Sequence, residues 1–298
     1  MSDLELITID TGDLRFTARA AGPVDGSVVL LLHGFPDRAA TFDGQLAALA
    51  AAGFRAIAPT MRGYEPSSQP ADGDHSLVTL ADDVVAWMDE LDVERAHVVG
   101  HDWGAATTYL AITRHPERFE RAVTLAVPPT PRIPDAVRKV PKQILLSWYM
   151  TFFQLRVVAD RIAAAKEHAL IRWLWSSWSP TLDAPDDLRD VFAQPGVLRS
   201  ALAYYRQNAT PPLLLGLRQN EATVIASTSV PTLVIHGEDD RCLDRRLFDH
   251  AVVEADFSGG VRREMLPGAA HFLHLEQPDT VNELILDWLN GGSSAGGE

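Results

Sequence analysis

The residue of this sequence best suited to covalent chemistry is Asp102, which stands between Gly100 and Gly104. A β-branched stretch precedes it and an amphipathic stretch follows it, and such a pattern is typical of a sharp strand-to-helix turn that presents one side chain to a cleft. A carboxylate attacks an acyl carbon poorly, but it can displace a leaving group at a saturated carbon and form an ester that water can still cleave. The pattern therefore predicts a nucleophile for carbon; the structural alternative is an Asp that only caps a helix.

Two further groups of polar residues could complete such a site. An acidic loop at 238–240 follows one predicted strand, and His271 lies in a loop of small residues after the next. Because the carboxyl ends of parallel strands meet at one edge of an open sheet, these residues can meet Asp102 there. An acid and a His in this order could activate water against an ester. His274 lies three residues after His271, but without a further ligand in register we expect no metal site.

The apolar pattern indicates the elements that must position these residues. Continuous apolar runs such as 28–32 predict strands buried on both faces of a sheet, and apolar repeats with helical spacing predict the helices between them. This alternation favours a mostly parallel sheet covered by helices on both faces. The predicted strands are 4–9, 14–20, 28–32, 54–58, 97–99, 121–127, 231–237 and 262–266, and the predicted helices are 41–52, 79–91, 105–114, 245–255 and 281–290.

The stretch after Val127 interrupts the alternation. Several prolines follow, and the next 85 or so residues carry helical patterns without a clear buried strand, which favours an inserted helical domain. Aromatic residues concentrate in this insertion; most are expected to form its own core, and several could face an apolar ligand. The predicted division is an α/β core of 1–129 and 218–290, a helical cap of 130–217 and a flexible tail of 291–298.

Charge and composition exclude several classes of partner. The 298-residue chain has a net charge of -14, which is unfavourable for binding nucleic acid or an anionic membrane surface. Its single cysteine, Cys242, excludes an intrachain disulfide and favours a reducing compartment. The first residues do not resemble a signal peptide, and no uninterrupted apolar run reaches about 18 residues. We therefore expect a cytoplasmic protein with no nucleic-acid or membrane partner.

Seven motifs together carry a family resemblance. They are His33-Gly34-Phe35-Pro36, Arg62-Gly63-Tyr64, Gly100-His101-Asp102-Trp103-Gly104, Ser147-Trp148-Tyr149-Met150, Ala201-Leu202-Ala203-Tyr204-Tyr205-Arg206, Gly237-Glu238-Asp239-Asp240 and His271-Phe272-Leu273-His274-Leu275-Glu276-Gln277-Pro278. Over nearly its whole length the chain resembles the soluble, cap-containing epoxide hydrolases of the α/β-hydrolase superfamily. The resemblance implies an α/β-hydrolase fold, in which a mostly parallel eight-stranded sheet has helices on both faces and an inserted all-helical cap.

The same resemblance implies an activity. In that family a carboxylate opens an epoxide, and water then cleaves the resulting ester to release a vicinal diol. By motif position Asp102 is implied as the nucleophile, Asp240 rather than Asp239 as the orienting acid, and His271 as the base. The implied partners are a small apolar epoxide and water, with no cofactor and no metal, and the implied role is detoxification. A homo-oligomer is left open.

Residues around the nucleophile also receive roles from the resemblance. Two cap tyrosines would hydrogen-bond the epoxide oxygen; they match Tyr149 and Tyr205, and Tyr204 is the adjacent alternative for the second. Backbone N–H groups of Phe35 and Trp103 would form an oxyanion hole, with a cis peptide bond after Phe35. We expect the substrate pocket to be lined by aromatic side chains, namely Phe35, Trp103, Trp148, Phe152 and Phe272.

Two other functions fit parts of the pattern. A haloalkane dehalogenase uses the same Asp turn and the same residue order, but it usually holds the halide with a side-chain N–H at the position of Phe35, which has none. The fluoroacetate type of dehalogenase needs an Arg where Trp103 stands. The alternative from another class is a non-catalytic small-molecule binder on the same fold. Such binders tend to lose a catalytic residue, and this sequence keeps each of them.

Overall fold

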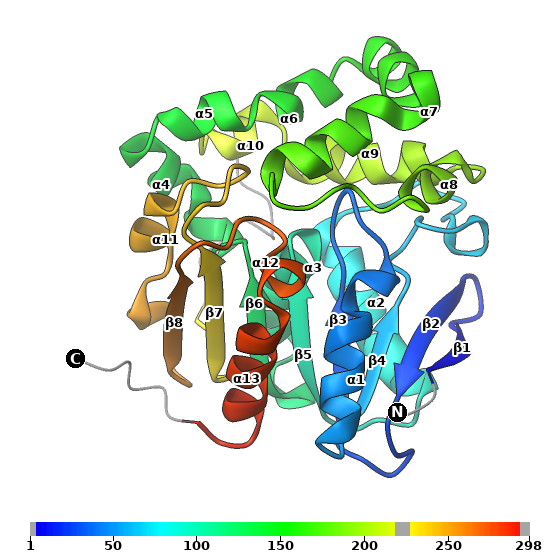
Figure 1. The fold of residues 1–298 in the computed structure, drawn as a ribbon, viewed down its shortest axis with the longest axis vertical. Coiled ribbons are helices and arrows are strands. Elements are labelled where there is room, and N and C mark those ends of the chain that lie inside the picture. The colour runs from blue at the N-terminus through cyan, green and yellow to red at the C-terminus, as the bar shows by residue number, and fades with distance from the viewer. Residues whose placement is uncertain (1–3, 218–226, 293–298) are drawn as a thin grey trace.

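A single sheet of eight strands forms the centre of the computed structural model, which describes residues 4–217 and 227–292 (Figure 1). The strand order is β1-β2-β4-β3-β5-β6-β7-β8; β2 runs antiparallel to β1 and β4, and the pairs from β4 to β8 are parallel. The strands are β1 Glu5–Asp10, β2 Arg15–Ala21, β3 Val28–Leu32, β4 Arg55–Pro59, β5 Ala96–His101, β6 Phe119–Leu125, β7 Thr232–Gly237 and β8 Val261–Leu266.

The inner strands are buried on both faces, as their continuous apolar sequences predict. Every residue of β4, β5 and β7 is buried, whereas the edge strand β1 is mostly exposed. A parallel sheet is normally covered by helices on both faces, so that neither face is exposed to water. The carboxyl ends of β5, β7 and β8, which precede the candidate site residues, consequently lie at the same edge of the sheet.

Four long helices cover the sheet (Figure 1). α1 (Asp43–Ala51) and α13 (Pro278–Leu289) pack together on one face, and α2 (Leu77–Glu90) and α3 (Trp103–Arg114) pack together on the other. Their apolar stripes account for these positions, since side chains three and four residues apart share one side of a helix. Two short helices follow β7 and β8 in the chain, α11 (Arg246–Ala251) and α12 (Leu273–Glu276).

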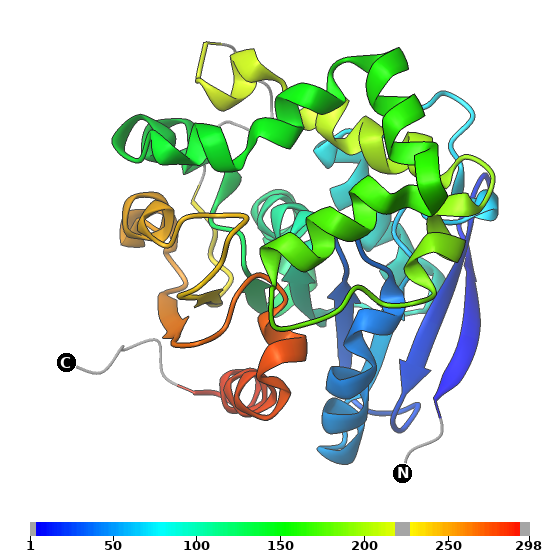
Figure 2. The ribbon, with the colours of Figure 1, turned by 45° about the horizontal axis from the view of Figure 1, so that its top comes forward.

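The segment between β6 and β7 forms a helical layer above the carboxyl edge of the sheet (Figures 1 and 2). Its described part contains no β-strand, in keeping with the absence of a buried-strand pattern in its sequence. The α-helices of this layer, called the cap below, are α4 Ile133–Lys139, α5 Lys142–Leu146, α6 Trp148–Phe153, α7 Arg156–Trp178, α8 Leu188–Ala193, α9 Val197–Asn208 and α10 Pro211–Leu214.

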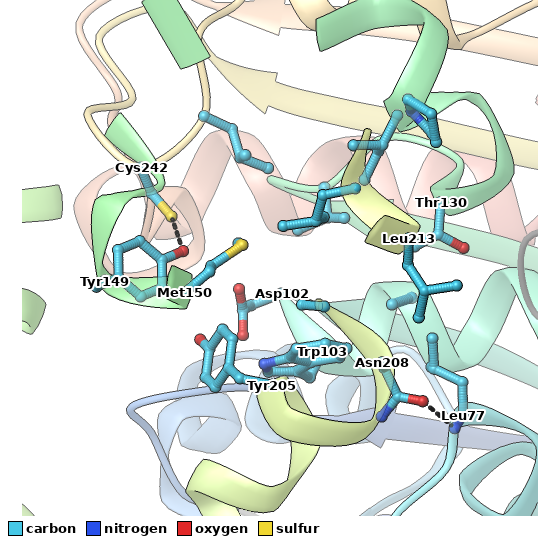
Figure 3. A pocket seen from close by; sticks show the side chains of 17 residues that line it. Leu77, Asp102, Trp103, Thr130, Tyr149, Met150, Tyr205, Asn208, Leu213 and Cys242 are labelled. Atoms are coloured by element: carbon cyan, nitrogen blue, oxygen red, sulfur yellow. Dashed lines mark hydrogen bonds between the residues drawn. The ribbon is translucent and has the colours of Figure 1, made fainter. Parts of the chain in front are cut away.

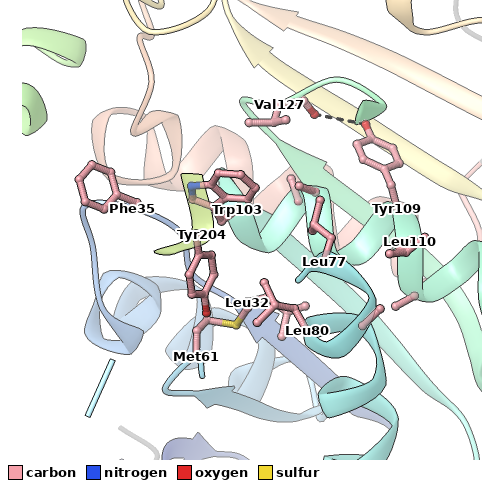
Figure 4. Packing of buried hydrophobic residues seen from close by; sticks show 14 of the residues in the cluster. Leu32, Phe35, Met61, Leu77, Leu80, Trp103, Tyr109, Leu110, Val127 and Tyr204 are labelled. Carbon is pink, nitrogen blue, oxygen red and sulfur yellow. Dashed lines mark hydrogen bonds between the residues drawn. The ribbon is translucent and has the colours of Figure 1, made fainter. Parts of the chain in front are cut away.

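The apolar core on one side of the sheet continues into the cap. One cluster of buried residues includes Trp87 of α2, on one face of the sheet, as well as Trp175 and Tyr204 of the cap. Figure 4 shows part of this cluster, in which Tyr204 lies next to Trp103 with ring centroids 5.8 Å apart. Burial of a large apolar side chain contributes roughly 1.5–3 kcal/mol to folding. The shared cluster therefore holds the cap against the nucleophile turn.

The predicted fold class is confirmed: a mostly parallel eight-stranded sheet, helices on both faces and an inserted helical cap. The expected boundary after residue 217 adjoins residues 218–226, and most of the expected tail is 293–298; both stretches lie outside the described residues. Among the helices that the structure describes, none has the length and apolar character needed to cross a membrane.

Candidate active site

Asp102 occupies the turn between β5 and α3. Its backbone has φ 53° and ψ -117°, a combination that non-glycine residues rarely adopt. Such strain costs on the order of 1–3 kcal/mol and persists only where the surroundings fix it. The backbone N–H of Asp102 donates to the carbonyl oxygen of Leu125 (3.3 Å), which ties the turn to β6.

Two glycines allow the chain to pass close to this turn. A Cβ added to Gly104 would lie 1.9 Å from the carbonyl oxygen of Leu32, so no side chain fits where α3 crosses β3. A Cβ on Gly34 would lie 2.4 Å from the Cβ and Oδ1 atoms of Asp102. Both glycines thus permit close approach of backbone to the nucleophile turn. The peptide bond between Phe35 and Pro36, just beyond Gly34, is cis as expected.

The two carboxylate oxygens of Asp102 have different neighbours. The backbone N–H of Phe35 donates to Oδ1 at 2.7 Å, and Oδ2 lies 3.5 Å from Nε2 of His271. Trp103 is the first residue of α3, where backbone N–H groups have no acceptor within the helix. One carboxylate oxygen therefore accepts from the backbone N–H of Phe35, and the other is next to a histidine.

His271 and Asp240 form a buried pair at the adjoining strand ends. Nδ1 of His271 lies 3.0 Å from Oδ2 of Asp240, and both side chains are fully buried. Since the carboxylate can only accept, Nδ1 carries the proton and Nε2 faces Asp102. Oδ1 of Asp240 accepts from the backbone N–H groups of Cys242 (2.6 Å) and Leu243 (3.0 Å). These bonds hold the acid in the orientation that aligns the imidazole.

Electrostatics favour a charged His271. Burial by itself lowers the pKa of His271, but the charge of Asp240 and the contacts with both carboxylates outweigh it and raise that pKa to about 10. For Asp240, burial acts to raise the pKa, and the charge and hydrogen bond of His271 bring it below its ordinary value. The site thus holds an imidazolium whose Nδ1 faces Asp240 and whose Nε2 faces Asp102.

A second layer of polar residues supports His271. Nε2 of His101 lies 2.9 Å from the carbonyl oxygen of His271 and must donate to it, which leaves Nδ1 of His101 as an acceptor. His274 pairs through Nε2 with Thr41 at 2.7 Å. Asp37, His101 and His274 offer ligand atoms that lie within 4.8 Å of one another, and they are the described residues most suited to holding a metal ion. His271 is not among them; its Nδ1 faces Asp240 and its Nε2 faces Asp102.

Tyr149 on α6 and Tyr205 on α9 reach from the cap toward Asp102 (Figure 3). Both line the same cavity as Asp102, and both are at most 1% exposed. Tyr204 points elsewhere, since its hydroxyl donates to the carbonyl oxygen of Arg62 at 2.8 Å. Burial, followed by neighbouring polar groups, raises the pKa of Tyr149 and of Tyr205 well above the ordinary value, so both hydroxyls remain protonated donors.

The cavity beside Asp102 has a different lining from the expected one (Figure 3). Of the five aromatic residues expected there, only Trp103 is among the lining residues. Trp148 is 42% exposed on the outside of the cap, and Phe272 stacks on Trp175 with ring centroids 4.2 Å apart. Phe35 and Phe152 pack among other rings instead: Phe35 against Phe153, Trp178, Phe192 and Tyr205, and Phe152 against Trp148 and Phe153.

Several lining residues received no role from sequence reasoning. Met150 and Cys242 lie closest to the tyrosines, and Sγ of Cys242 is 3.4 Å from the hydroxyl of Tyr149. Cys242 follows Asp240 by two residues, so its position after the acid was the available signal. The remaining lining residues that sequence reasoning missed are Leu77, Ala106, Val127, Thr130, Ile133, Pro134, Asn208, Ala209, Leu213, Leu214 and Leu243.

Comparison with known protein sequences identifies a family and two relatives that match this chain. The family described as alpha/beta hydrolase fold matches residues 27–278. The AB hydrolase superfamily protein YfhM of Bacillus subtilis is 30% identical, over 94% of this chain and 96% of that protein. Epoxide hydrolase A of Mycobacterium tuberculosis is also 30% identical, over 95% of this chain and 96% of that protein.

Solved structures of epoxide hydrolases also superpose on this chain. The epoxide hydrolase VrEH1 of Vigna radiata superposes with a TM-score of 0.79 at 26% identity, covering 96% of this chain and 98% of that one. An epoxide hydrolase of Bacillus megaterium, solved with an inhibitor, has a TM-score of 0.79 at 24% identity, covering 96% of this chain and the whole of that one. At 24% identity, the comparison with the Bacillus megaterium enzyme shows similarity of fold alone.

Proposed function

The chain belongs to the α/β-hydrolase fold family, within its group of epoxide hydrolases, and from this premise we propose that it converts apolar epoxides into vicinal diols through an ester on Asp102. One observation carries the proposal. The carboxylate of Asp102 lines a cavity together with two tyrosines, and Nε2 of His271, which pairs with Asp240, lies 3.5 Å from its Oδ2.

In the first step, we propose, a carboxylate oxygen of Asp102 attacks a ring carbon and the carbon–oxygen bond of the epoxide breaks. Negative charge develops on the ring oxygen, and the hydroxyls of Tyr149 and Tyr205 donate hydrogen bonds to it. That oxygen gains a proton and becomes a hydroxyl, while His271 loses its proton through solvent as the charge of Asp102 disappears. The raised pKa values of the two tyrosines support their role, because a protonated phenol can donate at any working pH. Phe35 N–H remains bonded to Oδ1 at 2.7 Å, so Oδ2 is the freer oxygen for attack.

In the second step water attacks the ester carbonyl carbon of Asp102. His271 takes the proton of that water through Nε2, and Asp240 stabilises the imidazolium that forms. The negative charge that develops on the carbonyl oxygen is held by the backbone N–H groups of Phe35 and Trp103. Cleavage of the ester bond releases the diol and restores the carboxylate.

The pH dependence of ester accumulation follows from His271. Its pKa is about 10 partly because Asp102 is charged, so esterification, which removes that charge, lowers the pKa of His271 and lets it act as a base. Below the new pKa the base is protonated and hydrolysis slows by up to about tenfold per pH unit. We expect the ester fraction to rise as the pH falls from 9 to 6 during turnover of styrene oxide, measured by acid quenching and intact mass. An ester fraction that is highest at pH 9 contradicts this assignment.

The activity itself is tested against its nearest rival. The purified protein is incubated with styrene oxide and, separately, with 1-chlorohexane, and the diol and chloride are measured. We expect diol from the epoxide and no chloride above the rate of the Asp102→Ala variant, because Phe35 supplies no side-chain donor for a halide. Chloride release without diol formation would instead make the protein a dehalogenase.

We also propose the reactants and the cellular compartment. We infer a small apolar epoxide and water as the reactants, with no resident cofactor in the proposed steps. A single buried free cysteine, Cys242, supports a reducing compartment such as the cytoplasm. The division into core and cap is likewise our proposal, supported by the helical segment between β6 and β7.

A further inference from the structure

The cavity extends from Asp102 in one direction. Figure 3 shows Tyr149 and Tyr205 on one side of Asp102, and Leu77, Thr130 and Leu213 on the opposite side. The part of the cavity on this opposite side, called the arm below, is bounded by the start of α2, α3, the start of α4, the end of α9 and α10. Its lining includes Leu77, Ala106, Ile133, Pro134, Leu213 and Leu214.

Behind the two tyrosines the structure is filled by aromatic rings. Phe35, Phe153 and Trp178, called the aromatic wall below, are at most 3% exposed, and none of them lines the cavity. Ring centroids lie 5.0 Å apart for Tyr149 and Trp178, and 5.2 Å apart for Phe153 and Tyr205. Within the wall, the centroid of Phe35 is 5.8 Å from that of Phe153 and 6.3 Å from that of Trp178. Rings packed this densely leave no space for a further group without displacement of a side chain.

The arm favours an apolar group. The amide of Asn208 is fully engaged, because its Nδ2 donates to the carbonyl oxygens of His75 (2.8 Å) and Tyr204 (2.9 Å) and its Oδ1 accepts from the backbone N–H of Leu77 (2.8 Å). Most of the other lining side chains are aliphatic. Burial of apolar area there contributes about 25 cal/mol per Å², whereas a polar substituent would lose its hydrogen bonds to water.

We infer that the enzyme selects terminal epoxides, which carry a single apolar substituent on one ring carbon. This inference rests on the proposed function. The epoxide oxygen must reach Tyr149 and Tyr205 while a ring carbon faces Asp102. We infer that one ring carbon then points to the arm and the other to the rings packed against the two tyrosines, which form the aromatic wall. A substituent on the first carbon enters the arm. A trans substituent on the second carbon meets the wall.

The inference predicts a preference between two matched substrates. Styrene oxide has one phenyl group, and trans-stilbene oxide adds a second phenyl on the other ring carbon. We expect the wild-type protein to show a kcat/KM at least about 100-fold higher for styrene oxide, since exclusion of a group much larger than a methylene exceeds the discrimination of about 10–200-fold known for that smaller unit. Equal kcat/KM values for the two substrates overturn the inference and leave the proposed function intact. Absence of diol from both overturns the proposed function.

Variants of the wall test where the preference originates. Phe153→Ala removes a ring beside Tyr205 and is expected to shift the ratio of the two kcat/KM values toward trans-stilbene oxide by at least about tenfold. The ratio is measured within one preparation, so a general loss of activity or of folded protein does not affect it. Phe153→Leu, a smaller change, is expected to give an intermediate ratio.

The matched control lies in the arm. Leu213→Ala enlarges the arm without changing the wall, so it is expected to leave the ratio within about threefold of the wild-type value. A shift toward trans-stilbene oxide in Leu213→Ala, together with an unchanged ratio in Phe153→Ala and Phe153→Leu, would show that the wall does not set the preference.

Discussion

The His271→Gln variant is expected to trap a covalent ester on Asp102 when it meets styrene oxide. Ring opening uses Asp102 and the two tyrosines, whereas ester cleavage needs the base 3.5 Å from Oδ2. Removal of a general base costs about 10²–10⁴-fold, so we expect diol formation to fall by at least about 10²-fold. Intact mass spectrometry should show an increase of one styrene oxide per chain, and peptide mapping should place it on Asp102.

A double variant separates the ester from unspecific alkylation. His271→Gln combined with Asp102→Ala keeps the other lining residues of the cavity but lacks the nucleophile, so it should gain no mass. If the double variant is alkylated as extensively as His271→Gln, the adduct lies elsewhere. If His271→Gln gains no mass with several terminal epoxides, the proposed order of steps is wrong.

Loss of the two cap hydroxyls is expected to abolish ring opening. Tyr149→Phe and Tyr205→Phe each remove one donor to the developing oxyanion, which costs about 10²–10³-fold in kcat, and the double variant should lose at least about 10⁴-fold. The ester should not accumulate in these variants, because the step before it is slowed. Single-turnover mass spectrometry distinguishes this from the result with His271→Gln.

Tyr204→Phe is the matched control for the tyrosine pair. Its hydroxyl donates to the carbonyl oxygen of Arg62 and lies outside the cavity, so its loss should cost stability of about 1 kcal/mol and change kcat by less than tenfold. A loss in Tyr204→Phe as large as that in Tyr205→Phe would remove Tyr205 from its assigned role.

The core elements of the fold could be predicted because their sequence signals are local. The apolar run 28–32 gives a strand buried on both faces, and the observed β3 covers the same residues. Asp102, Asp240 and His271 each follow a predicted strand, and the topology of a parallel sheet brings such positions to one edge. A short-range pattern and one topological rule are sufficient for these three residues.

The cap could not be predicted in the same detail. On α6 the neighbouring residues Trp148 and Tyr149 differ in direction by about 100°, and the sequence does not say which one faces the core. The structure turns Tyr149 inward and leaves Trp148 42% exposed. Phe272 is not among the lining residues for a related reason: its ring stacks on Trp175 of the cap, a contact between segments far apart in the chain.

The contacts among the buried polar residues behind His271 could not be predicted from the sequence either. His101 and His274 belong to recognised motifs, and Asp37 follows directly after another, but their meeting depends on how three loops pack. Burial raises the pKa of Asp37 to about 6, against the nearby charge of Arg38, which lowers it. Buried groups of this kind are determined by tertiary packing, so no periodic pattern marks them.

The most direct test of the ester mechanism is the fate of labelled oxygen in a single turnover. Excess enzyme is mixed with styrene oxide in H₂¹⁸O, and both the diol and the peptide that contains Asp102 are analysed by mass spectrometry. If water attacks the carbonyl carbon of the Asp102 ester, the diol of the first turnover is unlabelled and ¹⁸O appears in the Asp102 carboxylate. Label in the first-turnover diol, with none in Asp102, would mean that water attacks the epoxide directly and would contradict the mechanism.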